Sequence, residues 1–129
     1  MTEALHQPLI VTPEYRDYVW GGQRLRPGQL TAEAWIVYEG DKVTSGPLED
    51  HTLADLAAEY GSALLGTRPI KRTGTRFPVL IKLLDCAEWL SLQVHPNDEQ
   101  AKQLAGTDHF GKTEAWHVVR ARPGGSASG

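Results

Sequence analysis

Two side chains able to bind a metal stand two residues apart in the stretch LSLQVHPNDEQA. They are Gln93 and His95, and Pro96 follows at once. Because side chains alternate between the faces of a β-strand, Gln93 and His95 would share one face, with Leu92 and Val94 on the other. We therefore expect a polar face at Gln93 and His95 and a packed apolar face behind it. Pro96, which lacks a backbone N–H, would end the strand just after His95.

A carboxylate, Glu114, follows in the stretch GKTEAWHVVRA. If Gln93, His95 and Glu114 converge, they offer an amide oxygen, an imidazole nitrogen and a carboxylate, a mixed set that suits a divalent ion such as zinc. His117 would alternate away from Glu114 on the same strand, so we do not expect it to be a ligand. The alternative is that Gln93 and His95 are a solvent-exposed polar pair on a half-exposed strand.

The elements that must position these residues are read from periodicity and capping signals. EAWIVYEG is rich in β-branched and aromatic residues, which favours a strand over residues 33–40. Two short helices are predicted within the stretches at residues 50–61 and 97–106. Thr52 with Asp55 indicates the start of the first and Gly61 its end, while Asn97 followed by acidic residues indicates the start of the second and Gly106 its end. We expect further strands over residues 76–86, 88–95 and 111–121. The pattern predicts a mainly β, antiparallel fold with two short helices, in one domain over residues 1–129 with a flexible tail at 123–129.

Composition limits the class of protein. The chain has 129 residues and a net charge of −3, so it lacks the basic excess of a nucleic-acid or anionic-membrane binder. It contains one cysteine, Cys86, and no apolar run near the roughly 20 residues that span a bilayer. We therefore expect a soluble protein of the cytoplasm, with neither a nucleic acid nor a membrane as partner.

Two long motifs suggest a family. FPVLIKLLDCAEWLSLQVHPNDEQA, followed by GKTEAWHVV, strongly resembles the type I mannose-6-phosphate isomerases, zinc enzymes of the cupin superfamily. The resemblance runs from about Tyr15 to Arg122, and the combination, order and separation of Q-V-H-P and G-K-T-E-x-W make it specific. It implies an antiparallel jelly-roll, cupin-like barrel, which would be incomplete in this chain.

The resemblance also implies roles for individual residues. Matches to the family's zinc ligands, for one Zn²⁺ per chain, are Gln93, His95 and Glu114. Matches to residues that line the substrate pocket are Lys82, Ser91 and Lys112. Lys112 is our candidate for the catalytic base, while Lys82 would bind the sugar or its phosphate as a point charge.

The implied reaction interconverts mannose 6-phosphate and fructose 6-phosphate through a cis-enediol, with the metal as Lewis acid. The family's fourth ligand, a His, and a substrate-facing Arg lie beyond Gly129, and no other His of this chain matches that ligand. Three hypotheses stay open: the N-terminal part of an isomerase, a non-catalytic metal- or sugar-binding cupin relative, or a chain that works only when paired with another. We expect residues 1–129 alone to bind zinc weakly, to lack useful turnover, and to associate through exposed strand edges.

Overall fold

The computed structural model describes residues 2–124. The chain divides into two compact units, and the boundary lies between Leu90 and Ser91. In the first unit the elements are a 3₁₀ helix, η1 (Glu3–His6), three strands, β1 (Glu14–Arg16), β2 (Glu33–Val37) and β3 (Ile81–Leu84), and three helices, α1 (Leu53–Tyr60), α2 (Ser62–Leu65) and α3 (Thr67–Thr73). The second unit contains helix α4 (Asp98–Ala105). The expectation of one domain over residues 1–129 stays a prediction.

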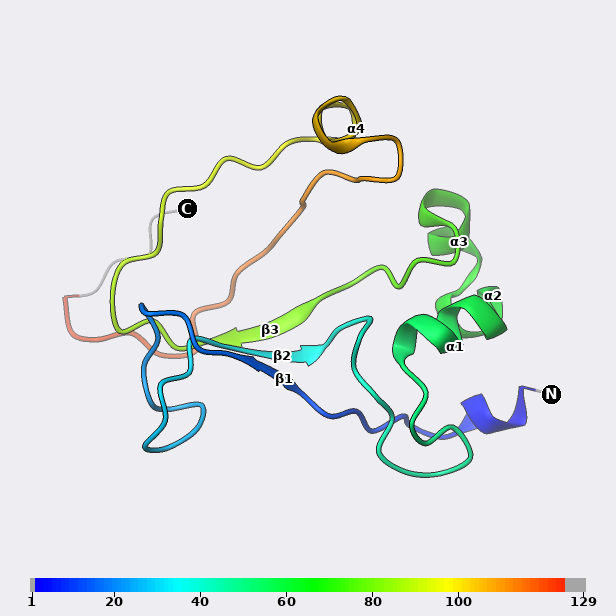
Figure 1. Ribbon diagram of the computed structural model, residues 1–129, viewed down its shortest axis with the longest axis horizontal. Coiled ribbons are helices and arrows are strands. Elements are labelled where there is room, and N and C mark those ends of the chain that lie inside the picture. The colour runs from blue at the N-terminus through cyan, green and yellow to red at the C-terminus, as the bar shows by residue number, and fades with distance from the viewer. Residues whose placement is uncertain (1, 125–129) are drawn as a thin grey trace. The chain divides into compact units, whose positions relative to one another are not determined.

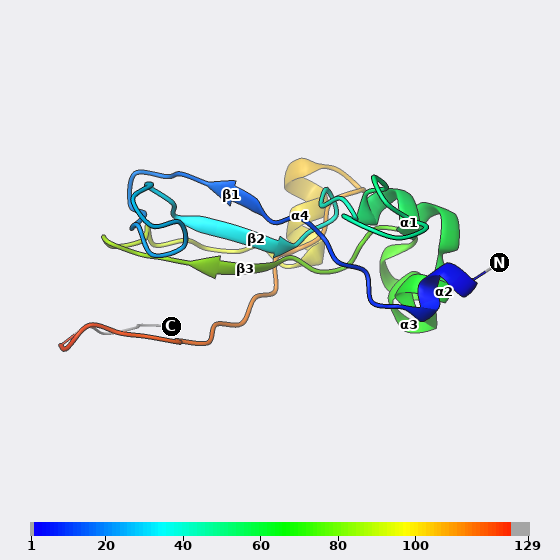
Figure 2. The ribbon, with the colours of Figure 1, turned by 90° about the horizontal axis from the view of Figure 1, so that it is seen from below.

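The sheet of the first unit is antiparallel, and β2 lies between β1 and β3 (Figures 1 and 2). Trp35 is paired with Glu14 on one side and with Lys82 on the other. Because residues opposite one another share a face, as do residues two apart, Glu33, Trp35 and Lys82 lie on the same face of this sheet. The register thus gathers one acid, one indole and one amine on one face.

Helix α1 of the first unit begins and ends where the sequence predicts. The Thr52 hydroxyl accepts from the Asp55 backbone N–H and the Asp55 carboxylate accepts from the Thr52 N–H, both at 3.0 Å, which forms a capping box. Gly61 and Gly66, with φ of 50° and 83°, separate α1 from α2 and α2 from α3. The two short helices α2 and α3 were not expected, since TRPIKRT carries no clear apolar stripe.

A small apolar core lies beside α1. Val43, Leu48 and Leu56 are buried, with 1%, 6% and 0% of their surface exposed. An isolated antiparallel bridge between Val11 and Val43 ties the N-terminal segment to it. Leu56 therefore anchors α1 through its apolar stripe, as the period of the sequence predicts.

Two expected strands are absent from the part of the chain that the structure describes. Residues 88–95 and 111–121 form no strand in residues 2–124. Leu92 and Val94, which we expected to pack, are 100% and 92% exposed. The prediction was wrong there because a strand needs a neighbour to take up its backbone hydrogen bonds, and a local pattern of alternation does not supply one.

The cupin-like barrel is not established by this fold. The three described strands form an open antiparallel sheet, and the described residues hold four α-helices rather than two. The antiparallel pairing is confirmed, while the jelly-roll stays a prediction. In the described range, none of the helices is both long and apolar enough for a bilayer. Of the tail expected to be flexible, residues 125–129 lie outside the described residues.

Candidate functional site

The second unit is built around the turn that leads into and out of α4. Asn97 caps the helix: its side chain accepts from the Gln100 N–H at 2.9 Å, and the Gln100 side chain accepts from the Asn97 N–H at 3.0 Å. This cap fixes the backbone two residues after His95. The helix ends at Gly106, and the chain then returns toward Pro96 (Figure 1).

The returning segment is fastened to the start of α4 by backbone contacts. The Lys112 N–H donates to the Pro96 carbonyl at 3.2 Å, and the Gly111 N–H donates to the Asp98 carboxylate at 2.9 Å. A Cβ on Gly111 would lie 2.5 Å from the Pro96 carbonyl oxygen, so only glycine allows this approach. These contacts bring Lys112 and the residues after it to the segment that carries His95.

Glu114 is the centre of the resulting cluster. Its Oε2 lies 3.2 Å from His95 Nε2 and 2.8 Å from Lys112 Nζ, and its Oε1 accepts from Trp116 Nε1 at 2.8 Å. The side chains of His95 and Glu114 are 26% and 29% exposed, so the cluster is open to small solutes. The structure thus brings together two of the three predicted ligands and the predicted base.

The same contacts set the charge of Glu114. Hydrogen bonds from Lys112, then from Trp116 and His95, lower the pKa of the Glu114 carboxyl from 4.5 to about 2. Glu114 is therefore ionised at neutral pH and can act as an anionic ligand without first losing a proton.

Gln93 and Ser91 form a separate pair. The Gln93 amide nitrogen donates to the Ser91 hydroxyl at 3.2 Å. Both residues are exposed on the extended segment before His95. This bond uses a donor of Gln93 rather than its carbonyl oxygen, which is the atom that a metal would take. The structure therefore places Gln93 next to the predicted substrate residue Ser91.

Lys82, the other predicted substrate residue, lies on β3 in the first unit. Its Nζ is 3.0 Å from Glu33 Oε1, and the opposite oxygen of Glu33 accepts from Trp35 Nε1 at 2.6 Å. Glu33 is only 6% exposed. Sequence reasoning missed Glu33, Trp35 and Trp116, although a signal for them exists: Glu-Ala-Trp occurs at residues 33–35 and again at residues 114–116.

The donor set of the cluster fits a zinc ion in part. Two ligands bonded to Zn²⁺ at about 2.0–2.1 Å with a tetrahedral angle lie about 3.3 Å apart. His95 Nε2 and Glu114 Oε2, at 3.2 Å, have that spacing. In the described residues no three His, Cys, Asp or Glu side chains gather as a metal group, so a third protein donor would have to be of another kind, as Gln93 is.

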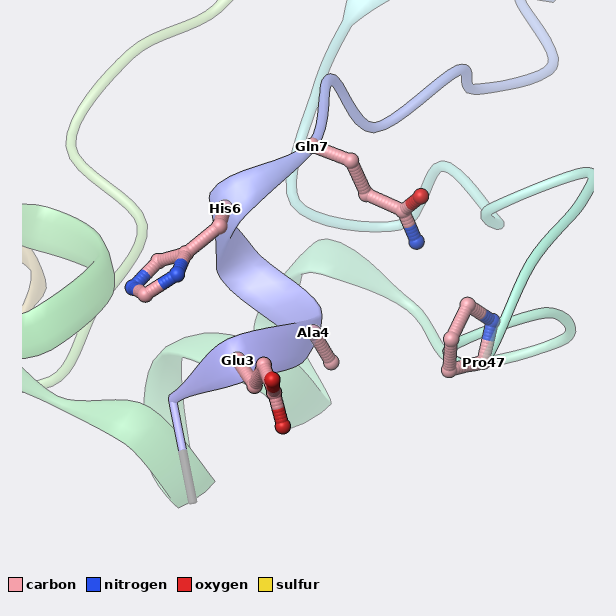
Figure 3. A pocket seen from close by; sticks show the side chains of 5 residues that line it. All are labelled: Glu3, Ala4, His6, Gln7 and Pro47. Carbon is pink, nitrogen blue, oxygen red and sulfur yellow. The ribbon is translucent and has the colours of Figure 1, made fainter.

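A pocket elsewhere in the first unit has no part in this cluster. It lies beside η1 and is lined by Glu3, Ala4, His6, Gln7 and Pro47 (Figure 3). None of these five is a residue that the sequence or the contacts described above connect with metal or sugar chemistry. We therefore base the chemistry on the Glu114 cluster and on the Glu33–Lys82 pair.

Comparisons with known proteins agree on one family. The model of the phosphomannose isomerase type I catalytic domain matches residues 9–117. The mannose-6-phosphate isomerase ManA of Bacillus subtilis is 36% identical over 123 residues, which cover 88% of this chain and 37% of ManA. The mannose-6-phosphate isomerase of Streptococcus mutans is 32% identical over 129 residues, covering 92% of this chain and 39% of that protein.

A solved structure gives the same result. The crystal structure of the mannose 6-phosphate isomerase from Bacillus subtilis superposes with a TM-score of 0.67 at 32% identity. The match covers 81% of this chain and 35% of that chain. The chain thus spans little more than a third of the length of the relatives that it matches.

Proposed function

The chain belongs to the phosphomannose isomerase type I family, and from this premise we propose that it serves the interconversion of mannose 6-phosphate and fructose 6-phosphate. The observation that carries the proposal is the contact of His95 and Lys112 with one oxygen of Glu114. That arrangement puts two metal donors beside an amine able to carry a proton. An aldose–ketose isomerisation needs both functions at one place.

The metal-binding part of the proposal assigns one Zn²⁺ to Gln93, His95 and Glu114. When bound, zinc would supply a Lewis acid that stabilises negative charge on the sugar oxygens. The 3.2 Å spacing of His95 Nε2 and Glu114 Oε2 supports this assignment. Gln93 would have to turn its carbonyl oxygen toward the pair and give up its bond to Ser91.

The proton-transfer part assigns the base to Lys112. The reaction moves one proton from C2 to C1 of the open-chain sugar through a cis-enediol, so the group that takes the proton also returns it. Lys112 Nζ, 2.8 Å from Glu114, is held next to the donor set where a sugar would bind. Ser91 and Lys82 would bind the substrate, the first through its hydroxyl and the second through its ammonium.

A second candidate function is that of a non-catalytic metal- or sugar-binding relative. The observation that favours it is the bond of Gln93 to Ser91, which leaves only two of the three assigned ligands in contact. For both candidates we propose the cytoplasm as the location, which fits a chain with one cysteine, and a sugar phosphate as the small-molecule partner.

Turnover by a chimera separates the two functions. Residues 9–117 of this chain would replace the matching part of Bacillus subtilis ManA, so that every position beyond the match is supplied by the relative. We expect the zinc-loaded chimera to form fructose 6-phosphate from mannose 6-phosphate. Lys112→Gln should lower kcat about 10²-fold or more while zinc content stays unchanged.

The control variant is Glu99→Gln, which alters an exposed acid on α4 and should leave the turnover of the chimera unchanged. A chimera that folds, binds zinc and binds mannose 6-phosphate without turning it over would contradict the isomerase and favour the binding relative. Equal turnover by Lys112→Gln and wild type would show that another group carries the proton.

A further inference from the structure

The same three-residue arrangement occurs once in each unit. In Glu33-Ala34-Trp35 and in Glu114-Ala115-Trp116, the indole N–H donates to the carboxylate two residues earlier, at 2.6 Å and 2.8 Å. A lysine then contacts the same carboxylate: Lys82 at 3.0 Å in the first unit and Lys112 at 2.8 Å in the second. In each unit, therefore, the carboxylate of a Glu-x-Trp pair contacts both the indole of that pair and a lysine Nζ.

The version in the first unit is the more buried of the two. Glu33 is 6% exposed, and the Lys82 side chain is 24% exposed. A buried carboxylate is costly unless both oxygens find partners, and here one oxygen accepts from Trp35 and the other from Lys82. Glu33 is therefore fixed by Trp35, and Lys82 is fixed by Glu33.

The sheet makes this geometry rigid. Trp35 and Lys82 are paired directly across β2 and β3, and Glu33 shares their face because it is two residues from Trp35. The guanidinium of Arg16, on β1, lies 4.2 Å from the centre of the Trp35 ring and adds a cation–π contact. All three strands thus take part in holding the Glu33 carboxylate in place.

We propose that Glu33 is a positioning residue, which orients the Lys82 ammonium toward an anionic, phosphorylated sugar. This rests on the proposed function, in which Lys82 contacts the substrate. An ammonium has three N–H donors, and Glu33 takes one, so two are left for phosphate or hydroxyl oxygens. A flexible lysine that is held in advance binds its ligand without first having to be ordered, which is the gain that Glu33 supplies.

A first experiment tests the orientation without any substrate. NMR of ¹⁵N-labelled lysine side chains in the 129-residue chain should show the Lys82 ammonium with slowed hydrogen exchange. Glu33→Gln should abolish that signal, and Glu59→Gln, an exposed acid on α1, should not. If Glu33→Gln fails to fold, Trp35→Phe retains an aromatic side chain but removes the indole N–H that donates to Glu33, and it should weaken the same signal.

A second experiment tests whether the orientation serves binding. Calorimetric titration of the zinc-loaded ManA chimera with mannose 6-phosphate gives the Kd of the unsubstituted chimera and of its Glu33→Gln, Lys82→Gln and double variants. Loss of one charge-assisted hydrogen bond corresponds to about tenfold in Kd, so each single variant should weaken binding about tenfold. Because Glu33 acts through Lys82, Glu33→Gln should add less than about twofold once Lys82 is already Gln.

The outcomes separate the inference from the proposed function. An unsubstituted chimera that binds no mannose 6-phosphate, while the Lys82 signal of the 129-residue chain is protected, would overturn the proposed function. Binding by the chimera that Glu33→Gln leaves unchanged would overturn the positioning role alone, and so would additive losses in the double variant. A purely structural Glu33 would lower the unfolding midpoint and leave the Kd of the folded protein unchanged.

Discussion

A side chain on Gly111 would place its Cβ 2.5 Å from the carbonyl oxygen of Pro96. Gly111 lies one residue before Lys112, and Pro96 lies one residue after His95, so the close approach of Gly111 to Pro96 brings the two segments of the candidate site together. The Lys112 N–H bond to the same oxygen depends on it. Gly111 has no reactive side chain, yet its lack of a Cβ allows the segments that carry His95 and Lys112 to approach each other.

Gly111→Ala should accordingly weaken metal binding. The added methyl group must push the segment with Lys112 and Glu114 away from Pro96, which separates Glu114 from His95. We expect at least about a tenfold loss in zinc affinity, the effect typical of disturbing the surroundings of a ligand. Calorimetric titration with zinc measures it. Thr113→Ala, at an exposed position two residues on, is the control and should bind zinc as wild type does.

The free energy of unfolding should depend on pH because the capping box of α1 contains an ionised carboxylate, that of Asp55. Hydrogen bonds from the Thr52 side chain and backbone lower the pKa of Asp55 below its usual 3.8 in the folded chain. Because the pKa of Asp55 is lower in the folded chain than in the unfolded chain, the ionised carboxylate stabilises the fold fully at any pH above its usual pKa. This stabilisation is lost as the pH falls through the folded pKa. Asp55→Asn should thus be less stable than wild type at pH 7.

The measurement is urea unfolding of both proteins from neutral to acidic pH. The difference in free energy of unfolding between wild type and Asp55→Asn should shrink below pH 3.8 as Asp55 takes up its proton. Glu59→Gln, in the same helix, is the control. A difference that stays constant to the lowest pH would mean that the charge of Asp55 does not stabilise the helix.

The exposed apolar side chains before α4 should drive association. Leu92 and Val94 are 100% and 92% exposed, and burying two exposed apolar side chains against another chain would remove them from water. Sedimentation velocity of residues 1–129 should show self-association that rises with concentration. Replacing both residues with Ser should reduce it, whereas Leu104→Ser, 81% exposed on α4, should not. A monomer at all concentrations would contradict this prediction.

The parts of the fold that the sequence predicts are those specified by local contacts. The α1 and α4 helices follow from Thr52 with Asp55 and from Asn97, whose side chains bond to backbone groups three residues away. Strand β2 follows from its β-branched and aromatic residues. The strands expected over residues 88–95 and 111–121 could not be settled in this way, because pairing depends on a distant neighbour that alternation does not reveal.

The same distinction between local and distant contacts applies to the candidate site. The approach of Glu114 to His95 was predictable once both were placed near one turn, and the structure has them 3.2 Å apart. The bond of Gln93 to Ser91 was not predictable, because side-chain torsions decide which partner Gln93 takes. Glu33 was overlooked because its role depends on pairing between β2 and β3.

The central claim is that His95 and Glu114 hold a divalent metal and His117 does not. The direct measurement is the zinc content and affinity of residues 1–129 as wild type, His95→Asn, Glu114→Gln and His117→Asn. We predict one zinc per wild-type chain at saturation, a loss of about 10²-fold or more in affinity for His95→Asn and Glu114→Gln, and wild-type binding for His117→Asn. If His117→Asn loses zinc as strongly as His95→Asn, or if Glu114→Gln binds as wild type does, the account of the site is wrong.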